Sequence, residues 1–290
     1  MSSEPLDHDR GHDSGLAHDL QILVRQDAAR RRALRWLAAG SLASLAVLGC
    51  GGGGHETSTT TTTGGPGGTG SSGSCTVIAT EAAGPFPGDG TNSSGSGVAN
   101  VLTLAGIVRS DIRTSIAGAS GTAAGVPLTV TLKLVNINAT CAGLAGYAIY
   151  LWHCDRSGGY SLYSSGVTDQ NYLRGVQVTD SNGEVTFTTI FPACYSGRWP
   201  HIHFEIYPSL AVATNGSNDV KTSQLALPAA ACNQVFGVVA GYETSVANFA
   251  AVSLTSDGVF GNDSAAYQLA TVTGNATSGF TATLSVGIAA

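Results

Sequence analysis

Hydrophobic and polar positions alternate in short runs through the second half of the chain, the pattern of β-strands with one buried face. The clearest run sets Phe280, Ala282, Leu284, Val286 and Ile288 against threonine, serine and glycine. Other runs are short and rich in β-branched or aromatic residues. We expect strands at residues 128–135, 148–154, 185–190, 201–207 and 280–288.

Clusters of turn residues separate these runs and set the expected architecture. Turns are indicated at residues 157–159 and 273–275, and residues 180–183 (Asp-Ser-Asn-Gly) predict a hairpin between 176–179 and 185–190. After the leader, the sequence contains no long amphipathic helix pattern and no internal repeat. We therefore expect an all-β fold, a two-sheet β-sandwich with long loops at residues 110–125 and 209–220.

The first 74 residues have a different organisation. Residues 1–49 resemble an export signal, with a twin-arginine-like Arg30-Arg31-Arg32 and an apolar run too short to span a membrane comfortably. The run ends at Cys50 in a lipobox-like sequence, although an ordinary secretory signal with a chance cysteine remains the alternative. Residues 50–74 are a Gly/Thr/Ser-rich tether, and residues 75–290 form the domain. We expect an exported protein of the cell envelope or exterior, lipid-anchored at Cys50, by either the twin-arginine or the general secretory route.

The charge and the cysteine content indicate which partners and which cellular compartment suit the protein. The leader carries six basic and six acidic residues, so the whole net charge of −6 belongs to the rest of the chain. This acidic balance disfavours nucleic acid as a partner. Five cysteines follow the tether, which in an exported protein suggests two disulfides and one free thiol, with the pairing left open: Cys75, Cys141, Cys154, Cys194 and Cys232.

A pair of histidines on one predicted strand is the main chemical feature. Because side chains alternate along a strand, His201 and His203 share a face with Glu205 and Tyr207, opposite an apolar face of isoleucine and phenylalanine. Two imidazoles on one face can hold a metal ion. His153 lies on the strand before Tyr160, and we interpret it as a structural or supporting residue, not a ligand.

The surroundings of this pair resemble a known family. The run from Leu173 to Tyr195, continued by Arg198-Trp199-Pro200-His201-Ile202-His203, resembles the intradiol ring-cleavage dioxygenases, which include protocatechuate 3,4-dioxygenase and catechol 1,2-dioxygenase. It looks most like their secreted branch. Residues 151–155 with Gly159-Tyr160, and residues 222–225, also match, so that the resemblance covers most of residues 84–227.

The resemblance implies a non-haem Fe(III) site with four protein ligands: Tyr160, Tyr195, His201 and His203. Hard phenolate oxygens suit Fe(III), which in turn stabilises the deprotonated phenols. By resemblance, Tyr195 is also the base for a substrate proton, Arg198 stabilises negative charge on the substrate, and Gln224 lines the pocket. The substrates would be a small aromatic diol and O₂, and the product a cis,cis-muconate-type diacid.

Some positions depart from the family and keep a second interpretation open. Pro87 replaces the tyrosine that usually follows Gly-Pro-Phe, only Ser196 and Gly197 separate Tyr195 from Arg198, and Leu225 stands where the family is usually aromatic. These changes suggest a more open pocket. An exported binding module for aromatic or catecholic ligands, with little or no turnover, is the alternative function. A second alternative is a purely structural surface lipoprotein. The helical dimerisation segment of catechol 1,2-dioxygenases is absent, so the oligomeric state is not implied.

Overall fold

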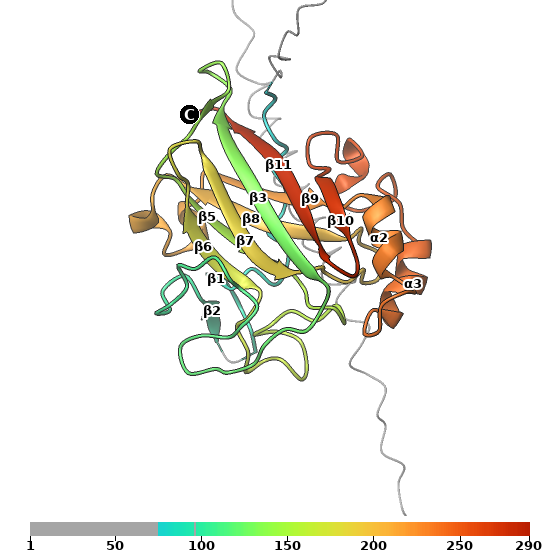
Figure 1. The fold of residues 1–290 in the computed structure, drawn as a ribbon. Coiled ribbons are helices and arrows are strands. Elements are labelled where there is room, and N and C mark those ends of the chain that lie inside the picture. Colours follow the sequence, from blue (N-terminus) through green and yellow to red (C-terminus); the bar gives the residue numbers. More distant parts are fainter. Residues whose placement is uncertain (1–74, 96) are drawn as a thin grey trace, which may run out of the picture.

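The computed structural model describes residues 75–95 and 97–290, which form two facing β-sheets with short helices at one end (Figure 1). The leader, Cys50 and the tether lie outside the described residues. Within the part that is described, no helix is long and apolar enough to cross a membrane. The predicted two-sheet β-sandwich is confirmed.

The first sheet is built around one long central strand. β3 (Pro127–Asn136) pairs in parallel with β11 (Gly279–Ile288), which pairs in turn with β10 (Thr271–Asn275). The other edge of β3 pairs with β7 (Glu184–Ile190) and then, beyond it, with the two-residue β4 (Ala142–Gly143). In the second sheet all neighbours are antiparallel, in the order β6 (Arg174–Val178), β5 (Ala148–Trp152), β8 (His201–Tyr207) and β9 (Lys221–Ala226).

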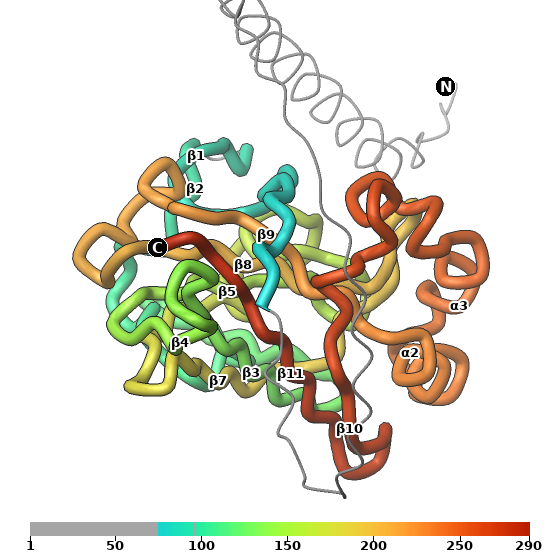
Figure 2. The backbone as a smooth tube through the Cα atoms, turned by 90° about the horizontal axis from the view of Figure 1, so that it is seen from above, coloured from blue at the N-terminus to red at the C-terminus, as the bar shows by residue number. Residues whose placement is uncertain are grey.

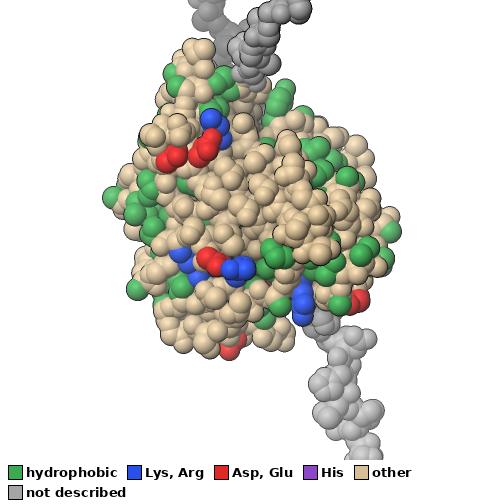
Figure 3. All heavy atoms as spheres, in the orientation of Figure 1, with side chains coloured by type: hydrophobic (Ala, Val, Ile, Leu, Met, Phe, Trp, Pro, Cys, Tyr) green, Lys and Arg blue, Asp and Glu red, His purple; other side chains and the backbone are tan. Residues whose placement is uncertain are grey.

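The main core lies between the sheets. β3 contributes alternating leucine and valine side chains, and β8 contributes Ile202, Phe204 and Ile206 from the opposite side. The outward positions of the first sheet are mostly polar, as in the exposed hydrogen bond between Thr131 and Thr186 and the ion pair between Lys133 and Glu184. Charged side chains are scattered sparsely over the face in Figure 3. The alternation of threonine with leucine or valine therefore follows from one covered and one solvated face.

The second sheet is covered on both faces. Its outer face carries Tyr150, Trp152 and Tyr207, which pack against Val101, Leu102 and Ile107 of the N-terminal segment. That segment includes the small sheet β1 (Asp89–Ser93) and β2 (Val98–Asn100), which lies away from the helices in Figures 1 and 2. Every residue of β5 and β8 is consequently buried, so the histidine face of β8 lies inside the protein.

The helices are short. α2 (Ala229–Val235) and α3 (Glu243–Ala250) lie at the β10 end of the sandwich in both views. Single 3₁₀ turns occupy Leu210–Val212, Gly216–Asn218 and Phe260–Asn262. The loop at residues 110–125 has only isolated bridges. Neither helix reaches three turns, which explains why the sequence contained no clear amphipathic period.

The hairpin expected at residues 180–183 is not present. The turn at residues 180–183 forms, with Asp180 Oδ1 accepting from the backbone N–H groups of Asn182 and Glu184 at 2.8 Å each, but it does not close a hairpin. Instead β6 pairs with β5 and β7 pairs with β3, so the turn carries the chain from one sheet to the other. The turn residues determine that the chain reverses its direction here. Which strand each neighbour pairs with depends on packing in the core between the sheets.

The cysteine prediction is also corrected. One disulfide joins Cys75 to Cys141. The other three cysteines of the described residues are free and buried: Cys154, Cys194 and Cys232. For Cys154 and Cys194 the sequence left open a disulfide or buried thiols, and they are buried thiols that point to the carbonyl oxygens of Ala193 and Arg198 at 3.7 and 3.4 Å. Burial raises the pKa of the Cys194 thiol to about 12, so these are packed, unreactive thiols.

Candidate active site

Two histidines on β8 form one half of the site. The Nε2 atoms of His201 and His203 lie 3.0 Å apart, and both rings are almost completely buried. The register of the sheet places His203 between Trp152 on β5 and Gln224 on β9. The strand periodicity expected from the sequence therefore puts both imidazoles on the outer face of the second sheet.

Tyr160 enters the site from a loop that is fixed by its own turn. Asp155 Oδ1 accepts hydrogen bonds from the N–H groups of Ser157 and Gly159 at 2.8 and 3.0 Å. The backbone N–H of Tyr160 then donates to Ser164 Oγ at 2.9 Å. This arrangement places the Tyr160 hydroxyl 3.2 Å from His203 Nε2, deep inside the protein.

Tyr195 enters from the loop between β7 and β8. The N–H of Arg198 donates to the carbonyl oxygen of Tyr195 at 3.3 Å, closing a tight turn in which Gly197 has a φ of 78°. A positive φ at the third position of such a turn favours glycine. The Tyr195 hydroxyl lies 3.1 Å from His201 Nε2 and 3.5 Å from the Tyr160 hydroxyl. Two phenol oxygens and two imidazole nitrogens thus meet at one point.

Three of the four donor groups, Tyr160, His201 and His203, are uncharged in the protein alone. Burial, followed by the positive charge of Arg198, lowers the pKa of His201 well below its ordinary value. Burial, then His201 and Arg198, has the same effect on the pKa of His203. Burial and the neighbouring Tyr195 raise the pKa of the Tyr160 hydroxyl well above its ordinary value. All these shifts favour neutral groups, whose lone pairs are available to a cation.

The donor set fits a hard, highly charged metal ion. His201 Nδ1 lies 2.5 Å from the carbonyl oxygen of Trp199, which places the ring proton on Nδ1 and leaves a lone pair on Nε2. No group of three or more His, Cys, Asp or Glu residues in the described ranges could hold a metal ion. A metal at this point would therefore need the two tyrosines as ligands, and phenolate oxygen favours hard cations such as Fe(III) over the softer ones.

His203 is held in a different way from His201. Its Nδ1 atom is buried and has no hydrogen-bond partner among the described residues. The ring stacks instead on the indole of Trp152, with the centroids 4.9 Å apart and the planes at 9°. Trp152 stacks in turn on Tyr150 at 4.9 Å. The orientation of His203 is thus set by aromatic packing against β5.

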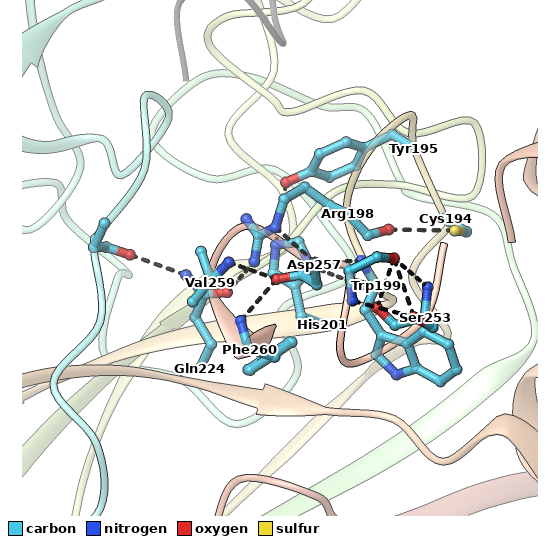
Figure 4. Close-up of polar contacts among 12 residues, drawn as sticks. Cys194, Tyr195, Arg198, Trp199, His201, Gln224, Ser253, Asp257, Val259 and Phe260 are labelled. Carbon is cyan, nitrogen blue, oxygen red and sulfur yellow. Dashed lines mark hydrogen bonds and ion pairs between the residues drawn. The ribbon is translucent and has the colours of Figure 1, made fainter. Parts of the chain in front are cut away.

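Arg198 and Gln224 lie next to each other beside this cluster, as Figure 4 shows. Arg198 Nη2 donates to Gln224 Oε1 at 2.6 Å, and Gln224 Nε2 donates to the carbonyl oxygen of Ala82 at 3.0 Å. On its other side, Arg198 Nε donates to Asp257 Oδ2 at 3.0 Å. Burial alone lowers the pKa of Arg198, but Tyr195 and Asp257 outweigh it and raise the pKa, so the guanidinium stays charged.

Comparison with known proteins supports the resemblance found in the sequence. The model of a family described as Dioxygenase matches residues 108–212, which contain Tyr160, Tyr195, Arg198 and both β8 histidines. An intradiol ring-cleavage dioxygenase from Tetranychus urticae superposes with a TM-score of 0.57 and 25% identity, covering 74% of this chain and 95% of that one. Over the segment that contains the candidate site, the chain is thus similar to the intradiol ring-cleavage dioxygenases. The predicted resemblance and enzyme class, an oxidoreductase, are confirmed.

Other solved dioxygenases are more distant. The dioxygenase domain of a fusion with a carbohydrate-binding protein from Streptomyces sp. SirexAA-E is 24% identical, with a TM-score of 0.41 over 63% of this chain and 88% of that one. Catechol 1,2-dioxygenase from Pseudomonas arvilla C-1 is 18% identical, with a TM-score of 0.40 over 63% and 58%. The family does not decide between the secreted and other branches, so that part of the resemblance stays a prediction.

The site contains two residues that the sequence did not reveal. Asp257, which pairs with Arg198, lies 59 positions further along the chain in a loop without any motif. Arg174 is buried, and its donors reach Ser161 Oγ, Tyr150 Oη and the carbonyl oxygens of Phe86, Pro87 and Ser161 at 2.6–3.1 Å. It therefore ties the segment over His203 and the loop of Tyr160 to β6. A charged residue within a buried strand was its only signal in the sequence.

His153 and Leu225 lie outside this site. His153 Nδ1 lies 2.7 Å from the carbonyl oxygen of Cys154, and its Nε2 lies 2.6 Å from Thr189 Oγ1. Both ring nitrogens are thus used within the protein. Leu225 points into the main core between the sheets. Its difference from the usual aromatic residue therefore does not open the pocket, contrary to our expectation.

Proposed function

We propose that this dioxygenase uses non-haem Fe(III) to cleave the rings of catechol-type diols with O₂, giving cis,cis-muconate-type diacids. The observation that carries the proposal is the meeting of two phenol oxygens and two imidazole nitrogens at separations of 3.0–3.5 Å. The iron would be held by Tyr160, Tyr195, His201 and His203. Bound Fe(III) supplies a Lewis acid and electron acceptor that makes a catechol ring reactive toward O₂.

The two tyrosines have different surroundings, which supports different roles. Tyr160 is buried and packs against Phe86, with the ring centroids 5.0 Å apart. Tyr195 is only partly buried, so its hydroxyl is the one that an incoming substrate can reach. We assign to Tyr195, which would be a tyrosinate with Fe(III) bound, the role of base: its oxygen would accept a proton from a catechol hydroxyl as the diol binds.

Arg198 and Gln224 bind and orient the substrate in this proposal. The guanidinium is held in place before the substrate arrives, because Asp257 and Gln224 accept from its Nε and Nη2 atoms. A fixed cation in a buried site stabilises negative charge as it develops on the substrate oxygens, without reorganisation during the reaction. Phe86 and Trp152 pack around Tyr160 and His203 and limit the access of water from the sheet side.

A visible absorption spectrum tests this function. We expect the iron-loaded protein to show a tyrosinate-to-Fe(III) charge-transfer band, and the band to move to longer wavelength when catechol is added under nitrogen. Admission of O₂ should then give ring-opened diacid, identified by mass spectrometry with both oxygen atoms from ¹⁸O₂. A protein that stays colourless after iron reconstitution would refute the ligand assignment. A shifted band without product would instead support the alternative, a binding module without turnover. The comparisons do not favour that alternative.

We further propose that the protein is exported and lipid-anchored at Cys50. The Cys75–Cys141 disulfide supports an oxidising compartment, because such bonds persist mainly outside the cytoplasm. Metabolic labelling with a clickable palmitate analogue should mark the wild-type protein, and C50A should abolish the label. Labelling that survives C50A would refute the anchor. Accumulation of precursor after R30K/R31K would indicate the twin-arginine route, and normal export the general secretory route.

A further inference from the structure

The carboxylate of Asp257 is fixed by four hydrogen bonds. Its Oδ2 atom accepts from Arg198 Nε at 3.0 Å and from the backbone N–H of Trp199 at 2.6 Å. Its Oδ1 atom accepts from the N–H groups of Val259 and Phe260 at 2.7 and 2.8 Å. The side chain is buried, and Figure 4 shows it joining the segment that follows α3 to the loop that leads into β8. A carboxylate with this many partners has a single position.

Asp257 and Gln224 together orient the guanidinium of Arg198. They accept from two different nitrogens, Nε and Nη2, and the ring of Phe260 lies 5.9 Å from the guanidinium carbon. No described residue accepts a hydrogen bond from the third nitrogen, Nη1. The planar group is therefore fixed along one edge, and its remaining N–H groups are available to a ligand.

The same contact balances charge. Arg198 is buried, and Asp257 supplies the carboxylate that forms an ion pair with it at 3.0 Å. A substrate that carries its own carboxylate thus meets a guanidinium that already has an anionic partner. A catechol without an anionic ring substituent needs no further positive charge from the site.

We propose that Asp257 is a positioning residue for the ring-cleavage reaction: it fixes the free N–H groups of Arg198 and balances their charge, so that the site favours catechols without an anionic substituent. The inference rests on the function proposed above. It assigns Asp257 an action through Arg198, in contrast to a role in folding alone, which its backbone hydrogen bonds would also support.

The variant D257N removes the charge and turns an amide N–H toward two existing donors. We expect kcat/KM for catechol to fall by about 100-fold, mainly in kcat, because displacement of a positioning group by about 1 Å has effects of this size. The ratio of kcat/KM for 3,4-dihydroxybenzoate to that for catechol should rise on the order of tenfold, because the unbalanced guanidinium can pair with the carboxylate. D111N is the matched control, because Asp111 pairs with Arg113 at 2.7 Å on the surface. It should change neither value.

A double-mutant cycle separates positioning from folding. If Asp257 acts through Arg198, D257N introduced into an R198Q background should lower kcat/KM by less than about threefold, because residues that act as a unit are not additive. An equal loss in both backgrounds would assign Asp257 a purely structural role and overturn the proposal. An unchanged substrate ratio in D257N would overturn the charge argument.

A crystal structure of the iron-free D257N protein gives a readout independent of turnover. The Arg198 guanidinium should leave the position that it holds in the wild type, and an unchanged position would overturn the proposal. If D257N fails to fold, D257E keeps the charge and displaces the carboxylate. The D257E variant should have a lower kcat/KM for catechol but keep its preference for uncharged catechols. A kcat/KM equal to that of the wild type would refute the positioning role of Asp257. If the wild type cleaves no catechol, the proposed function fails, and the crystal comparison still tests the role of Asp257.

Discussion

Acidification should destabilise the fold through His153, which is buried and uncharged. Its Nδ1 faces the carbonyl oxygen of Cys154 and must carry the ring proton, so Nε2 accepts from the Thr189 hydroxyl. Burial is the main cause that lowers the pKa of His153 to about 4. The unfolded chain has an ordinary histidine pKa near 6.5. Between these two values the unfolded state binds a proton that the folded state does not, and stability is lost as the pH falls.

The size of the effect follows from the two pKa values. One pKa unit corresponds to about 1.4 kcal/mol, so His153 should remove about 3 kcal/mol from the free energy of unfolding between pH 7 and pH 4. The variant His153→Asn can still donate toward Cys154 but does not titrate. Its destabilisation relative to the wild type should therefore shrink by about the same 3 kcal/mol over this range. The two β8 histidines titrate in both proteins and cancel in the difference.

Urea unfolding of the iron-free protein, followed by tryptophan fluorescence at pH 7, 6, 5 and 4, measures this difference. Tyr242→Phe is a suitable control, because the buried hydroxyl of Tyr242 binds Val126 and Phe191 and burial raises its pKa, away from the acid range. The cost of the control substitution should be constant with pH. A cost of His153→Asn that is the same at pH 4 and pH 7 would refute the reasoning.

Three further predictions concern the metal and the disulfide. Tyr195→Phe should retain iron but weaken the visible band and lower kcat by at least about 100-fold, measured by spectroscopy and oxygen uptake; unchanged turnover would remove Tyr195 as the base. Iron loading should release protons and strengthen with rising pH, because the raised pKa of Tyr160 keeps its hydroxyl protonated in the iron-free protein; a pH-stat measures the release, and none would contradict tyrosinate ligation. C75S/C141S should lower the free energy of unfolding by about 4 kcal/mol, given the 66-residue separation, and an unchanged urea midpoint would contradict this.

The sequence was most informative where local pattern and burial agree. The strand predicted at residues 201–207 is β8, because its histidine face and its apolar face alternate strictly. The fold also brings together Tyr160, Tyr195, His201 and His203, and their role as iron ligands is a proposal. Tyr195, His201 and His203 lie within one strand and the loop before it, so their relative positions depend mainly on local structure.

Contacts between distant segments were not predictable. Nothing near Asp257 in the sequence indicates a partner at Arg198, and Arg174 binds five groups spread from Phe86 to Ser161. The hairpin predicted after β6 was wrong for the same reason. The turn residues specify a chain reversal, but they do not specify which sheet the next strand joins. The disulfide pairing also depended on the fold, because only Cys75 and Cys141 approach each other within the described residues.

The parallel pairing of β11 with β3 has a consequence for how the protein reaches its fold. Phe280 lies opposite Leu128, so the centre of the first sheet joins segments about 150 residues apart. Pairings of such high contact order form slowly, because the entropy of closing the chain is lost before the contacts are gained. Until β11 arrives, one long edge of β3 is unpaired and can recruit a strand from another chain. Refolding yields should therefore depend strongly on protein concentration, and a holding chaperone would act by shielding this edge.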